Sequence, residues 1–171
     1  HGRAPAIATG MKRARPDMTI FTYQGDGDLA SIGLSEIVHC ANRGENVTVI
    51  FVNNTVYGMT GGQMAPTTLL GQQTTTSPYG RNHNTDGYPI RMAEMLGQLD
   101  GPSYVARMAL DTPGNILKAR KMIFKAFDMQ NRDMGFSFVE LLSNCSTNWG
   151  MNPSDSIKRI TEELIPYFPL G

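Results

Sequence analysis

The chain has 171 residues, of which 40% are hydrophobic, and it carries 15 basic and 15 acidic side chains. This length suits one globular domain, and the hydrophobic content argues against disorder. A formal net charge of zero argues against nucleic acid as a partner, and no apolar run approaches the roughly 20 residues that cross a membrane. Two cysteines are too few for a disulfide framework, so we expect a cytoplasmic protein.

Helical and β-rich segments alternate along the chain. Helices are predicted over 4–14, 31–43, 90–98, 113–130 and 154–164, and strands over 18–23, 47–52, 103–109 and 136–142. A long polar loop over 53–89 separates the two halves. The alternation predicts an α/β fold with a mostly parallel sheet and helices on both of its faces, in a single domain over residues 1–171.

Polar residues follow the first two predicted strands at the point where each strand ends. The first strand runs into Gly25-Asp26-Gly27-Asp28, and the second into Asn53-Asn54. A helix between them returns the chain, so the two strands should be parallel. Ligands of open α/β sheets bind at the carboxyl ends of the strands, where both motifs should lie together.

The glycine motif has more than one interpretation. Its spacing fits a dinucleotide site, but such a site needs an acidic residue at the end of the second strand, where Asn53-Asn54 stands. Asp26 would repel a pyrophosphate unless a cation lay between them. Magnesium resolves the conflict, with the Asp26 carboxylate, the Asn54 amide oxygen and a main-chain carbonyl as ligands. The plainer alternative is a tight turn in which Asp28 or Ser31 caps the helix.

Gly-Asp-Gly followed by Asn-Asn resembles the thiamine diphosphate fingerprint. Residues 56–63 (VYGMTGGQ) further resemble the segment of 2-oxoacid:ferredoxin oxidoreductases that binds the cofactor's phosphates. His1-Gly2-Arg3-Ala4, Thr9-Gly10 and residues 145–151 (CSTNWGM) are similar to flanking segments of that family. The resemblance covers essentially the whole chain. It is strongest to β subunits that act on 2-oxoisovalerate or 2-oxoglutarate, on the basis of 64–68 (MAPTT), Asn-Trp-Gly-Met and Pro-Tyr-Phe-Pro-Leu-Gly.

This resemblance implies roles for individual residues. Asp26 and Asn54 would bind Mg²⁺ through their side chains, and Val56 through its carbonyl. Thr60 would offer a hydroxyl and an N–H to the diphosphate, and Met59 would lie near the thiazolium ring, unless it simply fills the core. The implied cofactor-binding residues are Gly25, Asp26, Gly27, Asp28, Leu29, Asn54, Val56, Tyr57, Gly58, Met59 and Thr60.

The activity implied by the resemblance is oxidative decarboxylation of a 2-oxoacid to an acyl-CoA, with electrons passed to ferredoxin. The glutamate that activates the cofactor would belong to a partner, the α or pyrimidine-side subunit. We therefore name no catalytic residue and expect this chain alone to be inactive. Two alternatives stay open: another thiamine diphosphate enzyme, such as a decarboxylase or an acetolactate synthase-like protein, and a non-catalytic nucleotide-binding module.

Cys145 would be the fourth ligand of an iron–sulfur cluster in the parent protein, with three other cysteines upstream. The sequence has no initiator methionine, and we expect a fragment that lacks an N-terminal cluster-binding segment. Cys40 is predicted to be a buried helix residue, and the histidines lack the spacing of a zinc site. His1 could line the thiamine pocket, whereas Arg81 and Asn82 are expected at its mouth or against a partner.

Overall fold

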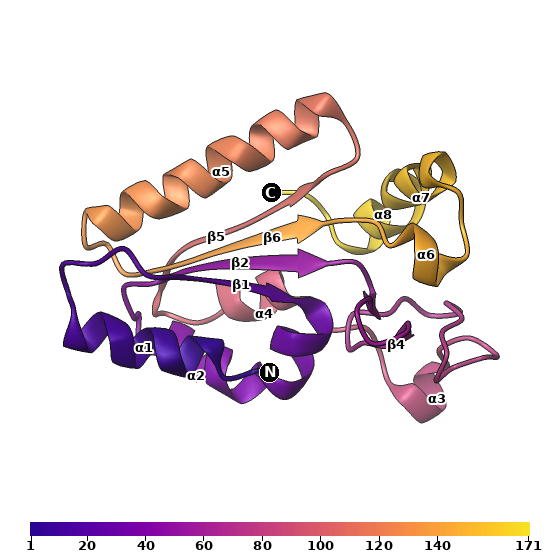
Figure 1. The fold of residues 1–171 in the computed structure, drawn as a ribbon, viewed down its shortest axis with the longest axis horizontal. Coiled ribbons are helices and arrows are strands. Elements are labelled where there is room, and N and C mark those ends of the chain that lie inside the picture. Colours follow the sequence, from indigo (N-terminus) through magenta and orange to yellow (C-terminus); the bar gives the residue numbers. More distant parts are fainter.

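Four strands form one parallel sheet in the order β1-β2-β6-β5 (Figure 1). The computed structural model describes residues 1–171. The strands are β1 (Phe21–Gly25), β2 (Thr48–Asn53), β5 (Pro102–Ala109) and β6 (Phe136–Leu142). Every pair in the sheet is parallel, and Gly25 lies beside Val52 at the carboxyl edge. The predicted parallel α/β architecture is therefore confirmed.

Helices cover both faces of this sheet. Helices α1 (Ala4–Ala14), α2 (Leu34–Asn42) and α4 (Met92–Gly97) pack on one face, and α5 (Pro113–Asn131) lies on the other (Figure 1). The central strands β2 and β6 are almost wholly buried, as their apolar sequences predict. The edge strand β1 buries only alternate residues, and Phe21 and Tyr23 remain exposed, with the Phe21 ring against Phe127 of α5.

Three of the predicted elements begin late or are divided in the structure. Strand β1 starts at Phe21 because the Lys12 ammonium binds the carbonyls of Pro16 and Met18 and holds that stretch in a turn. The helix predicted over 31–43 is divided at Gly33 into a π-helix η1 (Asp28–Ile32) and α2. The last predicted helix is likewise divided, into α7 (Pro153–Arg159), π-helix η2 (Ile160–Leu164) and α8 (Ile165–Tyr167).

The long polar loop and the C-terminal segments gather at the carboxyl edge of the sheet, on the right of Figure 1. They contain β3 (Val56–Tyr57), β4 (Gln63–Met64), α3 (His83–Asp86) and α6 (Ser146–Trp149). Arg81 corrects one expectation, because its buried guanidinium donates to six backbone carbonyls of the loop rather than facing a ligand or partner. Asn82 caps α3. No helix has the length and apolarity needed to cross a membrane.

Candidate functional site

A cleft of about 850 Å³ opens where the loops after β1 and β2 meet. It brings together nearly all the residues that the sequence motifs indicated. Leu29 is the exception, because its side chain is fully buried in the core below α2. His1 lines the cleft, as the sequence analysis considered. The indicated residues in its walls are Gly25, Asp26, Gly27, Asp28, Asn54, Val56, Tyr57, Gly58, Met59, Thr60 and Cys145.

Asp26 is a buried carboxyl group in the wall of this cleft, with only 2% of its surface exposed. Burial raises its pKa to about 7, although hydrogen bonds from Thr67 and from the backbone N–H groups of Gly27 and Thr55 oppose the shift. The Thr67 hydroxyl donates to Oδ2 at 2.7 Å, and the Gly27 N–H donates to Oδ1 at 2.9 Å. No basic side chain pairs with Asp26. A desolvated carboxylate of this kind fits a site for a bound cation.

The turn after β2 carries Asn54 into the same cleft. Asn54 Oδ1 accepts from the Val56 N–H at 3.2 Å, and the Asn54 carbonyl accepts from the Trp149 indole at 3.1 Å. Thr55 between them has a φ of 64°. This left-handed conformation is rare for a β-branched residue and costs about 1–3 kcal/mol. The turn is therefore held in a strained conformation at the point where oxygen ligands are needed.

The glycines of the first loop let the backbone approach a ligand closely. A Cβ at Gly27 would collide with the Tyr57 ring, so only glycine fits there without moving that ring. No side chain caps η1, which rules out the interpretation that Asp28 or Ser31 serves as its N-cap. The Asp28 carboxylate instead accepts from the Gly2 N–H at 2.5 Å and the Gln24 amide at 2.6 Å. The amide groups at the start of η1 have no side-chain acceptor and suit an anion.

Comparison with known proteins identifies the type of site. The sequence pattern of the family "thiamine pyrophosphate enzyme, C-terminal TPP binding domain" matches residues 1–141. The chain belongs to this thiamine pyrophosphate-binding family. The resemblance to a thiamine diphosphate-binding domain that was seen in the sequence is confirmed.

The relatives of this thiamine pyrophosphate-binding domain are oxidoreductase subunits. Ketoisovalerate oxidoreductase subunit VorA of Methanothermobacter thermautotrophicus is 50% identical over 99% of this chain and 36% of its own length. The 2-oxoglutarate synthase subunit KorB of Archaeoglobus fulgidus is 43% identical over 96% of this chain and 57% of its own. The structure of 2-oxoglutarate:ferredoxin oxidoreductase from Magnetococcus marinus, with 2-oxoglutarate, coenzyme A and succinyl-CoA bound, has a TM-score of 0.75 and 29% identity, over 95% of this chain and 50% of that one. The chain therefore spans only part of each relative.

The hairpin β3–β4 forms the outer lip of the thiamine pyrophosphate-binding domain's cleft. Met59 at its tip is fully exposed, which overturns the interpretation of this residue as core filler. The Thr60 hydroxyl binds the Gln63 side chain at 2.7 Å. A ligand that approached Thr60 would compete with Gln63 for that hydroxyl.

Cys145 also lines the cleft, beside the hairpin. The Asn148 side-chain amide donates to its sulfur at 3.1 Å and to the Gly58 carbonyl at 2.8 Å. No group of three or more His, Cys, Asp or Glu residues in the chain could hold a metal ion. Cys40, by contrast, is fully buried in the core, as predicted. Sequence reasoning missed Thr67 and Asn148, because nothing local marks a threonine or an asparagine that acts on residues distant in the chain.

Thr67 provides a direct test of the electrostatics at Asp26. In Thr67→Val, the loss of a hydrogen bond to a charged group should raise the pKa of Asp26 further, by about one to two units. Carbon-detected NMR titration of the Asp26 carboxyl group measures the shift. Thr22→Val is the matched control, since the buried Thr22 hydroxyl has no hydrogen-bond partner. An unchanged Asp26 pKa in Thr67→Val would contradict the conclusion that the Thr67 hydroxyl donates a hydrogen bond to the Asp26 carboxylate.

Proposed function

We propose that this chain supplies the diphosphate side of a thiamine diphosphate site in an enzyme that oxidatively decarboxylates a 2-oxoacid to an acyl-CoA. The observation that carries this proposal is Asp26, a buried carboxyl without a cationic partner, in one cleft with Asn54. A divalent ion would supply the missing positive charge. The family match and the names of the relatives support the same cofactor and reaction class.

The donor set suits magnesium. The Asp26 carboxylate, the Asn54 side-chain oxygen and the Val56 carbonyl are hard oxygen ligands, and Mg²⁺ prefers a few such ligands together with phosphate oxygens. When bound, the ion would neutralise the diphosphate. The backbone groups of Gly27, Asp28 and Leu29 would face the diphosphate, which requires only the backbone of Leu29 and agrees with its buried side chain. Thr60 would add a hydroxyl from the lip.

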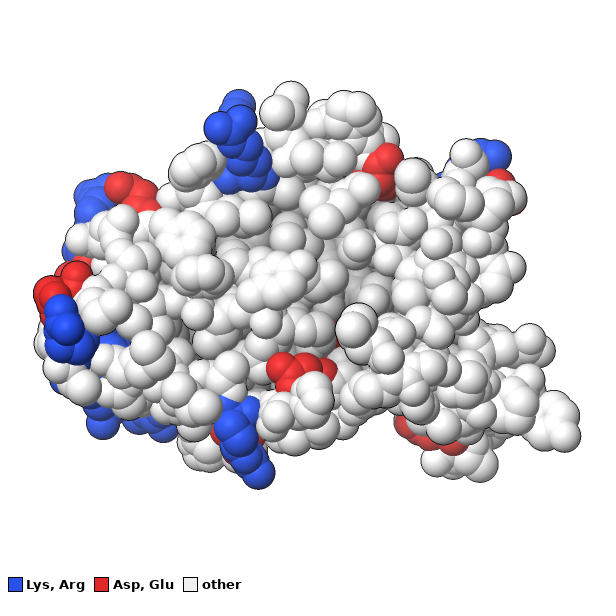
Figure 2. All heavy atoms as spheres, in the orientation of Figure 1, with Lys and Arg blue, Asp and Glu red and all other residues white.

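A partner subunit would complete the site. The loops at the carboxyl edge, on the right of Figure 2, show few charged side chains, and residues 53–80 contain no charged residue at all. Met59 and Tyr79 are almost fully exposed on these loops. Interface cores are depleted of charge and enriched in tyrosine and methionine, which supports docking of the pyrimidine-side subunit on this edge. Ferredoxin would accept the electrons, in the cytoplasm, where Cys40 and Cys145 remain free thiols.

We further propose that the domain formed by residues 1–171 works in the parent protein with a cluster-binding segment, and that Cys145 is a cluster ligand there. In the holoenzyme, Cys145→Ser should abolish the electron paramagnetic resonance signal of the reduced cluster and lower the iron content, because such clusters need four ligands. Cys40→Ala is the matched control, since Cys40 is buried away from the cleft. Full iron content and an unchanged signal in Cys145→Ser would refute the assignment.

Isothermal titration calorimetry with thiamine diphosphate tests the proposed function. Binding should require Mg²⁺, and the holoenzyme should reduce ferredoxin with a branched-chain 2-oxoacid or 2-oxoglutarate only when CoA is present. Turnover without CoA and without ferredoxin would identify a decarboxylase or an acetolactate synthase-like enzyme instead. Absence of binding with Mg²⁺ present would refute the cofactor site itself.

A further inference from the structure

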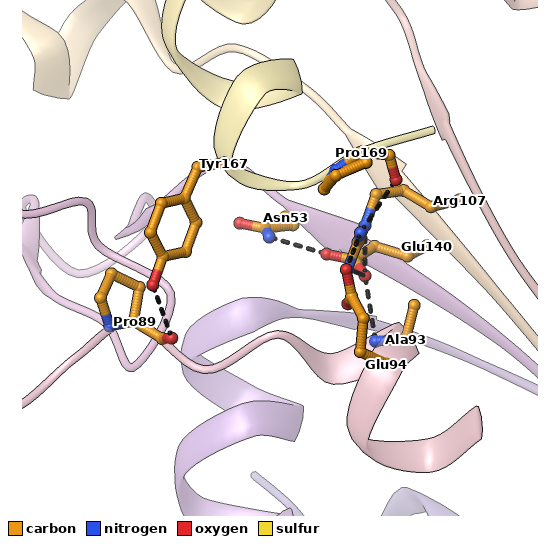
Figure 3. Close-up of polar contacts among 8 residues, drawn as sticks. All are labelled: Asn53, Pro89, Ala93, Glu94, Arg107, Glu140, Tyr167 and Pro169. Atoms are coloured by element: carbon orange, nitrogen blue, oxygen red, sulfur yellow. Dashed lines mark hydrogen bonds and ion pairs between the residues drawn. The ribbon is translucent and has the colours of Figure 1, made fainter. Parts of the chain in front are cut away.

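Asn53, the first asparagine of the Asn-Asn turn, does not face the cleft. Its side chain is fully buried and points to Glu140 on β6, as Figure 3 shows. The Asn53 Nδ2 donates to Glu140 Oε1 at 2.8 Å. Its Oδ1 accepts from the Thr55 N–H at 3.2 Å. Asn53 therefore connects the core of the sheet to the strained residue of the turn.

Glu140 is itself fixed by several donors (Figure 3). Arg107 Nε donates to Oε2 at 2.9 Å, and the Ala93 N–H donates to the same oxygen at 3.3 Å. Arg107 is held in turn by Glu94 and by the Pro169 carbonyl. Burial raises the pKa of Glu140, while Arg107 and the Asn53 amide oppose this shift and favour the carboxylate.

Glu140 pairs with the Arg107 guanidinium, and a carboxylate in such a pair only accepts hydrogen bonds, which fixes the direction of the chain of contacts. Facing Glu140, Asn53 must present its NH₂ group, so its carbonyl oxygen is turned to the Thr55 N–H. Thr55 lies between Asn54 and Val56, and its N–H also lowers the pKa of Asp26. The orientation of the Asn53 side-chain amide therefore affects the position of each proposed metal ligand.

We propose that Glu140 is a positioning residue for this site, which acts through Asn53 to hold the Thr55 turn and so places the oxygen ligands of Asn54 and Val56 around the bound cation. The inference rests on the proposed function. A buried ion pair is often no more stabilising than apolar residues of similar volume, so a contribution to stability alone does not account for Glu140 and Arg107. Their geometry accounts for a role in orienting Asn53.

A reciprocal exchange of the two side chains tests this role. In Glu140→Gln, Arg107 and Ala93 take the single remaining acceptor oxygen, so the new NH₂ group faces Asn53. Asn53 then turns over and directs a donor at the Thr55 N–H. In Asn53→Asp, two carboxylates face each other. In the double variant, the new carboxylate at position 53 accepts from both the new amide at position 140 and the Thr55 N–H, which restores the pattern of contacts.

Two measurements on the purified protein, with any co-purifying subunits, should follow this pattern. Each single variant should weaken Mg²⁺-dependent thiamine diphosphate binding by about 10–100-fold, the usual effect of removing a partner of a ligand, and the double variant should recover to within about threefold of wild type. Hydrogen exchange at the Thr55 amide, measured without ligand, should rise in both single variants and return in the double variant. Glu45→Gln is the control, since the buried Glu45 carboxylate pairs with Arg13 and Arg43 and contacts neither Arg107 nor Asn53, and it should leave both readouts unchanged.

Two results would overturn the proposal. One is normal Thr55 protection in Glu140→Gln, and the other is a double variant no better than the weaker single variant. If wild-type protein binds no thiamine diphosphate, the proposed function fails. The exchange rates in ligand-free protein then still decide whether Glu140 positions the turn.

Discussion

Replacing Asp26 with asparagine is expected to weaken Mg²⁺-dependent thiamine diphosphate binding by more than about 100-fold, while it stabilises the ligand-free protein at pH 8. The loss of affinity follows because the amide removes the charge that the metal requires; even partners of metal ligands cost about 10–100-fold. The gain in stability follows because Asp26 is buried without a cation. Asparagine preserves its shape and can still accept from the Gly27 N–H.

The direction of the pH dependence follows from the two pKa values of Asp26. Its pKa is about 7 in the folded chain, against an ordinary value of 3.8. The folded state therefore holds this proton more tightly, and the free energy of unfolding falls as pH rises from about 4 to about 7. A shift of this size corresponds to about 4 kcal/mol. Asp26→Asn does not ionise and should escape that loss.

Denaturant unfolding in EDTA at pH 5 and pH 8 measures the difference. The variant should exceed wild type at pH 8 by about 1–4 kcal/mol, and the gap should be smaller at pH 5. Calorimetry on the same preparations measures the affinity. Equal stability at pH 8 would show that Asp26 is not a desolvated carboxylate. Wild-type affinity would show that it is not a metal ligand.

Gly27→Ala is the second substitution that we expect to weaken thiamine diphosphate binding strongly, although it adds only one methyl group. A Cβ at Gly27 overlaps the ring of Tyr57, which also lines the cleft, so the ring must move. Overpacking of this kind costs about 1–3 kcal/mol, and the displaced ring should reshape the diphosphate side of the cleft. We expect thiamine diphosphate affinity to fall by about tenfold or more, as measured by calorimetry.

Gly114→Ala is the matched control, because a Cβ at Gly114 meets no atom within 4 Å and Gly114 does not line the cleft. Its affinity and stability should stay near wild type. Combining Gly27→Ala with Tyr57→Ala removes the overlap, so the double variant should be less destabilised than the sum of the two single changes. If the destabilisation of the double variant equals the sum of the two single changes, then the Tyr57 ring is not what excludes a side chain at position 27.

The four-stranded sheet and the helices that cover it were largely predictable, because each of these elements carries a local signal. The apolar run of β2 and the intervening helix predict a parallel pair, and parallel strands necessarily bring their carboxyl ends to one edge. That rule alone places Asp26 near Asn54, and the structure puts both in one cleft. The division at Gly33 was not predictable from periodicity. There, a Cβ would collide with the Gly2 backbone, which is a contact between distant segments.

By itself, the sequence determined the α/β class, the position of the cleft and the identity of its two principal side chains, since these depend on periodicity and on motifs at strand ends. Only the tertiary structure decided that Arg81 organises the loop, that Thr67 binds Asp26, and that Asn53 turns away to Glu140. The physical reason is the same for all three. Each side chain is buried, and a buried polar group must find its partner wherever the fold places one, here 13, 41 and 87 residues away along the chain.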